Sequence, residues 1–180
     1  MATRKMDIES QRLFIKPISI EEAQNLMVDA ESYPEWLDVP YDALWPDDGL
    51  KALLPIYVEA LEKDEKEYGF GPWIMLDKHK QMVIGDIGFK GSPISGIVEI
   101  GYYVSKIHRN QGYAKEAVEA MLQWAFSHED VRIVTASCQP SNIPSCRVLE
   151  SCGFMKSREE DGVVWFETRK ERHYGKDRTL

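Results

Sequence analysis

The sequence predicts an α+β fold, a mixed α/β sandwich in which helices flank one mostly antiparallel sheet. Three β-rich runs follow one another at residues 72–77, 82–89 and 98–104, separated by polar or glycine-containing turns. Such runs are expected to form an antiparallel meander. From Tyr113 to Phe126, apolar residues recur at helical spacing. This periodicity predicts a helix that packs back on the sheet.

The remaining elements follow from local signals. A strand over residues 12–18 leads into Ser19–Glu22, a capping box that predicts a helix over 20–30. A second helix is expected over 50–65, with Pro55 as a kink or as part of its first turn. The carboxyl-terminal part predicts four more elements, namely a strand at 133–138, a helix at 142–152, and two strands at 154–159 and 163–169 joined by an Asp161-Gly162 hairpin.

Length and composition predict one globular domain. The chain has 180 residues, of which 43% are hydrophobic and 29% charged, and this length usually supports a single core. We expect the domain over residues 8–170 and a charged, frayed tail over 171–180. No run reaches the ~20 apolar residues of a membrane helix, and the amino terminus lacks the apolar core of a signal peptide. The expected location is therefore cytoplasmic, away from membranes.

The formal net charge of −8 argues against binding nucleic acid through its phosphates, because that requires a basic surface. Between Asp29 and Glu67 there are twelve acidic residues against three lysines. This imbalance would attract a cationic amine, or it is only a solvated surface that keeps the protein in solution.

Cysteine and histidine placement predicts no metal site. Three cysteines, Cys138, Cys146 and Cys152, show no C-x-x-C spacing, and reduced thiols are expected. Surface or capping roles are expected for the four scattered histidines, which are His79, His108, His128 and His173.

The long connection over residues 32–49 is rich in proline, aspartate and aromatic residues and is expected to be irregular. Its aromatic residues Trp36, Tyr41 and Trp45 could form a wall for an acceptor. Alternatively, they could plug the edge of the core, which is the more common role.

The segment from Val104 to Ala114 carries the strongest chemical signal. A strand ends there and a helix begins, with Gly112 at the turn. Glycine lets successive N–H groups point inward, the helix N-terminus adds partial positive charge, and Arg109 adds a full one. The nucleoside-triphosphate motif G-x-x-x-x-G-K-[ST] and the dinucleotide motif G-x-G-x-x-G are both absent. The predicted ligand is therefore a diphosphate compound of another kind.

Several correctly spaced pieces resemble the GCN5-related N-acetyltransferase (GNAT) family. The pieces are Arg109-Asn-Gln-Gly-Tyr-Ala114, Glu116-Ala117, Asn142-Ile-Pro-Ser145 and Glu150-Ser-Cys-Gly-Phe154. The resemblance covers residues 12–169 in element order. In addition, Ile100-Gly-Tyr-Tyr-Val104 looks like the RimJ/RimL-like branch, which acetylates the amino termini of ribosomal proteins.

The resemblance implies that acetyl-CoA is the acetyl donor and lies between the strands at 98–104 and 133–138, which splay apart. It places the pyrophosphate on the loop of Arg109, Asn110, Gln111, Gly112, Tyr113 and Ala114. A backbone N–H near Val104 would polarise the carbonyl, and Asn142 would hydrogen-bond the cofactor arm near its sulfur end.

The resemblance also implies direct attack by an amine in a ternary complex, with a carboxylate or an ordered water taking the proton. Glu99 stands where the resemblance places an acid, although an exposed strand glutamate paired with a lysine or arginine is an equally good interpretation. Asp86 on the neighbouring strand is a second choice as the base and is better explained as a structural partner.

The proton donor for the departing thiolate is less clear from the sequence. Many family members carry a tyrosine where this chain has Leu149. The ribosomal-protein branch has a serine at the position of Ser145, whose hydroxyl could hydrogen-bond the thiolate or only its own helix backbone. Three tyrosines could substitute, namely Tyr102, Tyr103 and Tyr113.

Two alternatives to protein amino-terminal acetylation remain open at this level. One is acetylation of a small amine such as a polyamine, an aminoglycoside or an amino acid. The other is a sensor that binds acetyl-CoA without catalysis. The resemblance also makes a homodimer an expected assembly.

Overall fold

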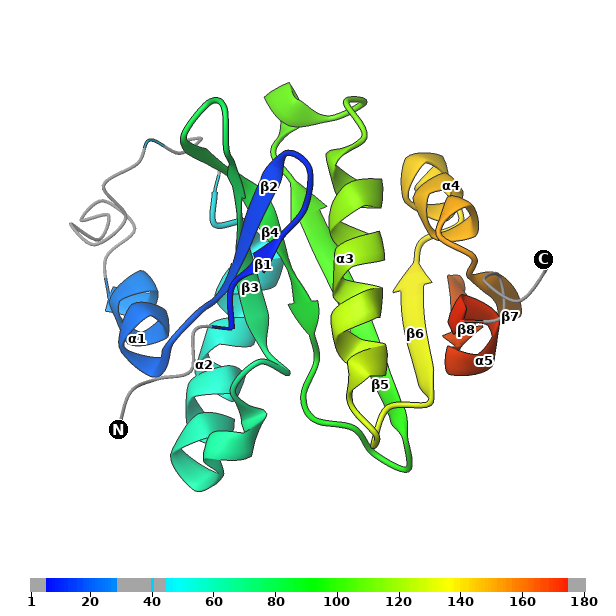
Figure 1. The fold of residues 1–180 in the computed structure, drawn as a ribbon, viewed down its shortest axis with the longest axis horizontal. Coiled ribbons are helices and arrows are strands. Elements are labelled where there is room, and N and C mark those ends of the chain that lie inside the picture. The colour runs from blue at the N-terminus through cyan, green and yellow to red at the C-terminus, as the bar shows by residue number, and fades with distance from the viewer. Residues whose placement is uncertain (1–5, 29–39, 41–44, 175–180) are drawn as a thin grey trace.

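The computed structural model describes residues 6–28, 40 and 45–174. In this part of the chain, eight strands form one sheet in the order β1-β2-β3-β4-β5-β6-β8-β7 (Figure 1). The strands are β1 (Ile8–Glu9), β2 (Leu13–Pro17), β3 (Pro72–Asp77), β4 (Met82–Phe89), β5 (Ile97–Val104), β6 (Ile133–Cys138), β7 (Met155–Glu160) and β8 (Val163–Arg169).

Helices cover both faces of this sheet. The helices are α1 (Ile20–Val28), α2 (Asp48–Lys63), α3 (Tyr113–Ser127), α4 (Ile143–Ser151) and α5 (Lys170–Tyr174), with short 3-10 turns η2 (Glu65–Glu67) and η3 (Lys106–His108). In Figure 1, α3 crosses in front of the sheet and α4 lies beside β6. The α+β class predicted from the sequence is therefore confirmed.

Strand pairing opens the sheet between β5 and β6. The predicted meander is present, because β3 pairs antiparallel with β4 and β4 with β5. β5 and β6 are parallel and pair only at Ile97–Glu99 with Ile133–Thr135. Beyond those residues β5 stays with β4, while β6 continues along β8 to Cys138. We call the region where the two strands no longer pair the wedge.

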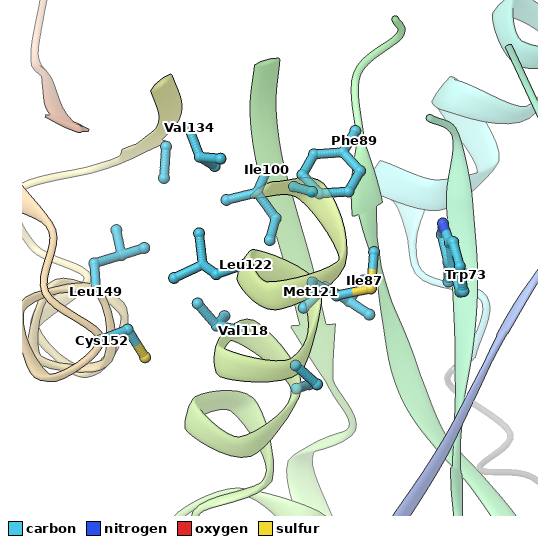
Figure 2. Close-up of a cluster of buried hydrophobic side chains, with 14 of the residues drawn as sticks. Trp73, Ile87, Phe89, Ile100, Val118, Met121, Leu122, Val134, Leu149 and Cys152 are labelled. Atoms are coloured by element: carbon cyan, nitrogen blue, oxygen red, sulfur yellow. The ribbon is translucent and has the colours of Figure 1, made fainter. Parts of the chain in front are cut away.

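One face of the sheet is closed by α3 and α4. Met121 of α3 is fully buried together with Ile87 of β4 and Ile100 of β5. Leu149 and Cys152 approach α3 from the side of α4 (Figure 2). Burying this much apolar surface holds the helices on the sheet, at about 25 cal/mol for each Å² removed from water.

The opposite face is covered by α1 and α2. The start of α1 was predicted correctly, and that of α2 was not. The capping box is present, since the backbone N–H of Ser19 donates to Glu22 (2.7 Å) and that of Glu22 donates to the Ser19 hydroxyl (3.2 Å). α2 begins earlier than expected, because the Asp47 carboxylate accepts from Leu50 N–H (2.9 Å) and caps it. Pro55 lies inside α2 rather than in its first turn.

Two further differences concern the ends of the described chain. The two-residue strand β1 was not predicted, because so short a run has no periodicity. The expected frayed tail begins with α5, which follows directly after β8. The predicted end of α1 at residue 30, together with Trp36 and Tyr41, lies outside the described residues.

Candidate active site

A pocket of about 650 Å³ lies at the open end of the wedge, a volume typical of a small-molecule site. Its walls come from the end of β5, the loop before α3, the first turn of α3, and α4. The lining residues are Tyr102, Tyr103, Val104, His108, Arg109, Asn110, Gly112, Tyr113, Ala114, Lys115, Asn142, Pro144, Ser145, Arg147 and Val148.

The amino end of α3 forms the anion-binding part of this pocket. Gly112 is the N-cap residue with φ of 82°, and no side chain caps the helix. Asn110 also has a positive φ, of 60°. The first-turn amides of a helix have no partner within the helix, and together with the helix dipole they favour a phosphate group.

Arg12, the residue just before β2, holds this loop in place. Its Nη1 donates to the Gln111 carbonyl (2.8 Å) and its Nε to Glu116 of α3 (2.7 Å). Burial opposes ionisation of Glu116, but hydrogen bonds from Ser10 and Arg12 outweigh it and lower the pKa of that carboxyl. The guanidinium also lies 4.4 Å from the centre of the Tyr113 ring. The loop is thus bound to β2 and α3 before any ligand arrives.

Tyr113 links the helix start to the sheet. It is buried, and its hydroxyl donates to the Asp77 carboxylate at the end of β3. Burial would raise the pKa of Asp77, but the hydrogen bonds from Tyr113 and from the Lys80 and His79 amides lower it instead. Asp77 therefore stays charged and holds the tyrosine in place.

Arg109 turns back onto the strand that precedes it. Its Nε donates to the Val104 carbonyl (2.9 Å), and its guanidinium lies 5.5 Å from the centre of the Tyr103 ring. The side chain therefore closes the end of β5 and keeps positive charge beside the pocket.

The start of α4 forms the other wall. Asn142 caps α4, because its Oδ1 accepts from Ser145 N–H (3.3 Å). The Ser145 hydroxyl lies 2.9 Å from the hydroxyl of Tyr102, which reaches across from β5. Ser145 therefore contacts the opposite side of the wedge as well as its own helix.

Glu99 lies at the closed end of the wedge, paired with Thr135, and does not line the pocket. Its Oε1 accepts from Lys90 Nζ (2.6 Å) and from the Ser137 hydroxyl (2.8 Å). The expected pairing with a lysine is therefore present. Both hydrogen bonds fall on the same oxygen, and among the described residues no hydrogen bond or ion pair is made to Oε2.

Asp86 and Trp45 form a buried pair on the face of α1 and α2. The Trp45 indole N–H donates to Asp86 (2.9 Å), and Trp45 is 2% exposed. Burial, followed by repulsion from Asp47, raises the pKa of Asp86 to about 8, although the bond from Trp45 acts in the opposite direction. Among the three aromatic residues of the long connection, Trp45 thus plugs the core, and Asp86 is its structural partner.

The structure brings most of the predicted site residues into one pocket. Two exceptions are Glu99 and Gln111, since Gln111 turns its side chain to the Ile107 carbonyl and to Lys80. A surface or capping role was expected for His108, yet it is buried and lines the pocket. The spacing of the histidines could not predict the burial of His108, because this burial depends on the turn η3.

Among the described residues, no group of three or more histidine, cysteine, aspartate or glutamate side chains could hold a metal ion. None of the helices there is both long and apolar enough to cross a membrane.

Comparison with known proteins identifies the class of this site. The family model described as "Acetyltransferase (GNAT) domain" matches residues 12–155. The chain therefore belongs to the GNAT family and is an acetyltransferase. Members of this family use acetyl-CoA. The uncapped start of α3 suits its diphosphate, and the wedge suits its long pantetheine arm.

Two relatives in Bacillus subtilis support this assignment. The chain is 37% identical over 112 residues to the uncharacterized N-acetyltransferase YjdG, covering 62% of this chain and 67% of that protein. It is 29% identical over 156 residues to the probable N-acetyltransferase YjcK, covering 83% of each chain.

Solved structures with the same fold include acetyltransferases of different kinds. One is ribosomal-protein-S5-alanine acetyltransferase from Vibrio fischeri (TM-score 0.65, 19% identity, 92% of this chain and 97% of that one). Another is the dodecameric spermidine N-acetyltransferase from Vibrio cholerae (TM-score 0.64, 13% identity, 93% and 99%). A third is the microcin C7 self-immunity acetyltransferase MccE in complex with acetyl-CoA and AMP (TM-score 0.58, 11% identity, 89% and 93%).

Proposed function

We propose that this protein transfers an acetyl group from acetyl-CoA to the α-amino group at a protein amino terminus. The choice of acetyl-CoA as the donor is supported by one observation. The start of α3, with Gly112 in the left-handed conformation, has no side-chain cap and lies at the mouth of the wedge. The choice of a protein amino terminus as the acceptor is supported by the sequence Ile100-Gly-Tyr-Tyr-Val104 in β5. It is also supported by the fold shared with a ribosomal-protein acetyltransferase.

The donor would enter with its pyrophosphate on the amides of Gly112, Tyr113 and Ala114, with the charge of Arg109 beside it. Its pantetheine arm would run along the unpaired edge of β5, where backbone groups beyond Glu99 have no strand partner on the β6 side. Backbone groups that are not paired in a sheet need other partners, and the amide groups of the arm would supply them near Val104. Asn142 would contact the arm from α4.

Acetyl transfer requires an amine that has lost its proton and a carbonyl that is polarised. Glu99 would take the amine proton through Oε2, directly or through a water, while Lys90 and Ser137 hold Oε1. The Ser145 hydroxyl would assist the departing sulfur from the α4 side, directly or through the Tyr102 hydroxyl that lies 2.9 Å away.

Small polyamines are the second candidate acceptors. The net charge of −8 favours the approach of a polycation, and one structure of the same fold is a spermidine acetyltransferase. Polyamines differ from peptides in a testable way, because they carry several ammonium groups and no peptide bond.

The test measures CoA release with mass detection of the product, using Ala-, Ser- and Met-starting peptides, polyamines, aminoglycosides and free amino acids. The same peptides with blocked amino termini are the matched controls. Turnover of the free peptides alone supports the proposal. Turnover of polyamines alone would move the assignment to the second candidate.

Two variants test the assigned roles. Glu99→Gln should lower kcat by about 100-fold, the usual range for loss of a general base, and Ser145→Ala should also lower it. Glu59→Gln is the matched control, because Glu59 is an ion-paired glutamate on the exposed side of α2, and it should retain wild-type kcat. Equal kcat for Glu99→Gln and Glu59→Gln would remove Glu99 from the mechanism.

A further inference from the structure

We propose that Tyr102 is the proton donor to the departing sulfur of CoA, and that Ser145 orients its hydroxyl and returns the proton to it. This inference rests on the proposed acetyl transfer. It chooses one donor among the three tyrosines that the sequence leaves open, which are Tyr102, Tyr103 and Tyr113.

The contact between Tyr102 and Ser145 crosses the wedge. Tyr102 belongs to the part of β5 that β6 no longer pairs, and its hydroxyl lies 2.9 Å from Ser145 Oγ and 3.2 Å from the Ser145 carbonyl on α4. Both residues line the pocket. A cofactor arm that follows β5 into the wedge therefore meets this hydroxyl pair.

The alternative hydroxyl groups are placed for other tasks. Tyr113 donates to the Asp77 carboxylate and is committed to holding the helix start. Tyr103 also borders the pocket, but its ring packs against the core on the face of α1 and α2 and lies under the Arg109 guanidinium. Leu149 has no proton to give and is 1% exposed, within the core cluster of α3 and α4 (Figure 2).

The environment of Tyr102 keeps its proton in place until a strong acceptor develops. Burial raises the pKa of Tyr102 to about 12, while the bond from Ser145 lowers it in part. The phenol is therefore neutral at physiological pH and carries a proton that it can give to the thiolate formed as the C–S bond breaks.

In the proposed step the amine nitrogen forms a bond to the thioester carbonyl carbon, and the electron pair of the C–S bond leaves with sulfur. Tyr102 gives its proton to that sulfur and releases CoA as the free thiol. The amine proton goes to Glu99 or to water. Ser145, which is only half-buried, then returns a proton to Tyr102 and regains its own from solvent, so both hydroxyl groups end unchanged.

The test compares Tyr102→Phe with Tyr57→Phe. Tyr57 is the matched control because its buried hydroxyl also donates to a carbonyl, that of Ile18 (2.8 Å), away from the pocket. With acetyl-CoA and the acceptor, Tyr102→Phe should lower kcat by about 100-fold and leave KM for acetyl-CoA within about threefold. Tyr57→Phe should change neither.

A second readout needs no acceptor. Free CoA is bound to each variant, and the thiolate is followed by its ultraviolet absorbance as pH rises. A hydroxyl that donates to the sulfur stabilises the thiolate, so Tyr102→Phe should raise the pKa of the bound thiol by about one unit or more. Tyr57→Phe should leave it unchanged. A purely structural role for Tyr102 would not move this value.

The two proposals fail differently. If the wild-type protein binds CoA and acetylates no amine, the proposed function fails, while the thiol titration still decides whether Tyr102 donates to the sulfur. If amines are acetylated and Tyr102→Phe changes neither kcat nor the thiol pKa, the role of Tyr102 is wrong and the proposed function stands.

Discussion

The two sides of the wedge are held by different forces. On the β5 side, the loop before α3 is fixed by charged and polar groups, chiefly Arg12, Glu116 and Asp77. On the β6 side, α4 is fixed to α3 by apolar side chains such as Leu149 and Cys152 (Figure 2). Directional bonds fix the positions of the groups that would meet the ligand, whereas apolar packing sets the spacing between the two sides.

This difference gives the two sides different sensitivities. Changes on the α4 side should act mainly on the free energy of unfolding, because they open cavities in a close-packed core. Changes at the loop should act mainly on ligand affinity, because that segment is exposed and adds little to the core.

The largest effect is expected for Leu149→Ala. Removing this buried side chain should lower the free energy of unfolding by about 2–5 kcal/mol, measured by urea denaturation. Leu149→Met, which conserves volume, should cost less than about 1.5 kcal/mol. A loss from Leu149→Ala no larger than that from Leu149→Met would contradict the apolar attachment of α4.

An intermediate effect is expected at Gly112. Asn and Asp both tolerate a left-handed backbone and have the same size, so the pair isolates charge. Gly112→Asp should bind acetyl-CoA about 10-fold more weakly than Gly112→Asn, because it adds a negative charge at the helix start that is assigned to the pyrophosphate, although its Cβ would lie 3.3 Å from Arg12 Nη2. The affinities are measured by calorimetry. Equal affinities would show that the anion lies elsewhere.

A pH-dependent effect is expected at Asp86, where a polar contact is buried on the other face of the sheet. The pKa of Asp86 is raised from its ordinary 3.8 to about 8, so the folded protein holds a proton that the unfolded chain releases. Stability from this group is complete below about pH 4, falls as pH rises, and is lost above about pH 8.

Asp86→Asn keeps an oxygen for the Trp45 indole and should remove this dependence. Relative to wild type, its free energy of unfolding should be higher at pH 9 and equal near pH 4, as measured by thermal unfolding. Asp48→Asn, at an exposed position, is the control. A constant difference across pH would mean that Asp86 is ionised in the folded protein.

Elements with strong local signals were predictable from the sequence. The spacing of Ala117 and Met121 predicted α3, and Asp161-Gly162 predicted the final hairpin, in which both residues have positive φ. The site loop was also predictable, because Gly112 marks a backbone conformation that other residues rarely adopt.

Contacts between distant segments could not be predicted in the same way. Arg12 lies 99 residues before Gln111, and no local sequence pattern predicts that it holds the loop before α3. Tyr102 was one of three tyrosines that the sequence left equivalent, and only the course of β5 past α4 separates it from Tyr103 and Tyr113. The burial of His108 likewise depends on how η3 turns.

The most direct test of the donor site compares the affinities of acetyl-CoA and S-acetylpantetheine for the wild-type protein by calorimetry. Because the pyrophosphate is assigned to the start of α3, acetyl-CoA should bind at least about 100-fold more tightly, and Gly112→Asp should reduce this advantage. Equal affinities for the two thioesters would contradict the account.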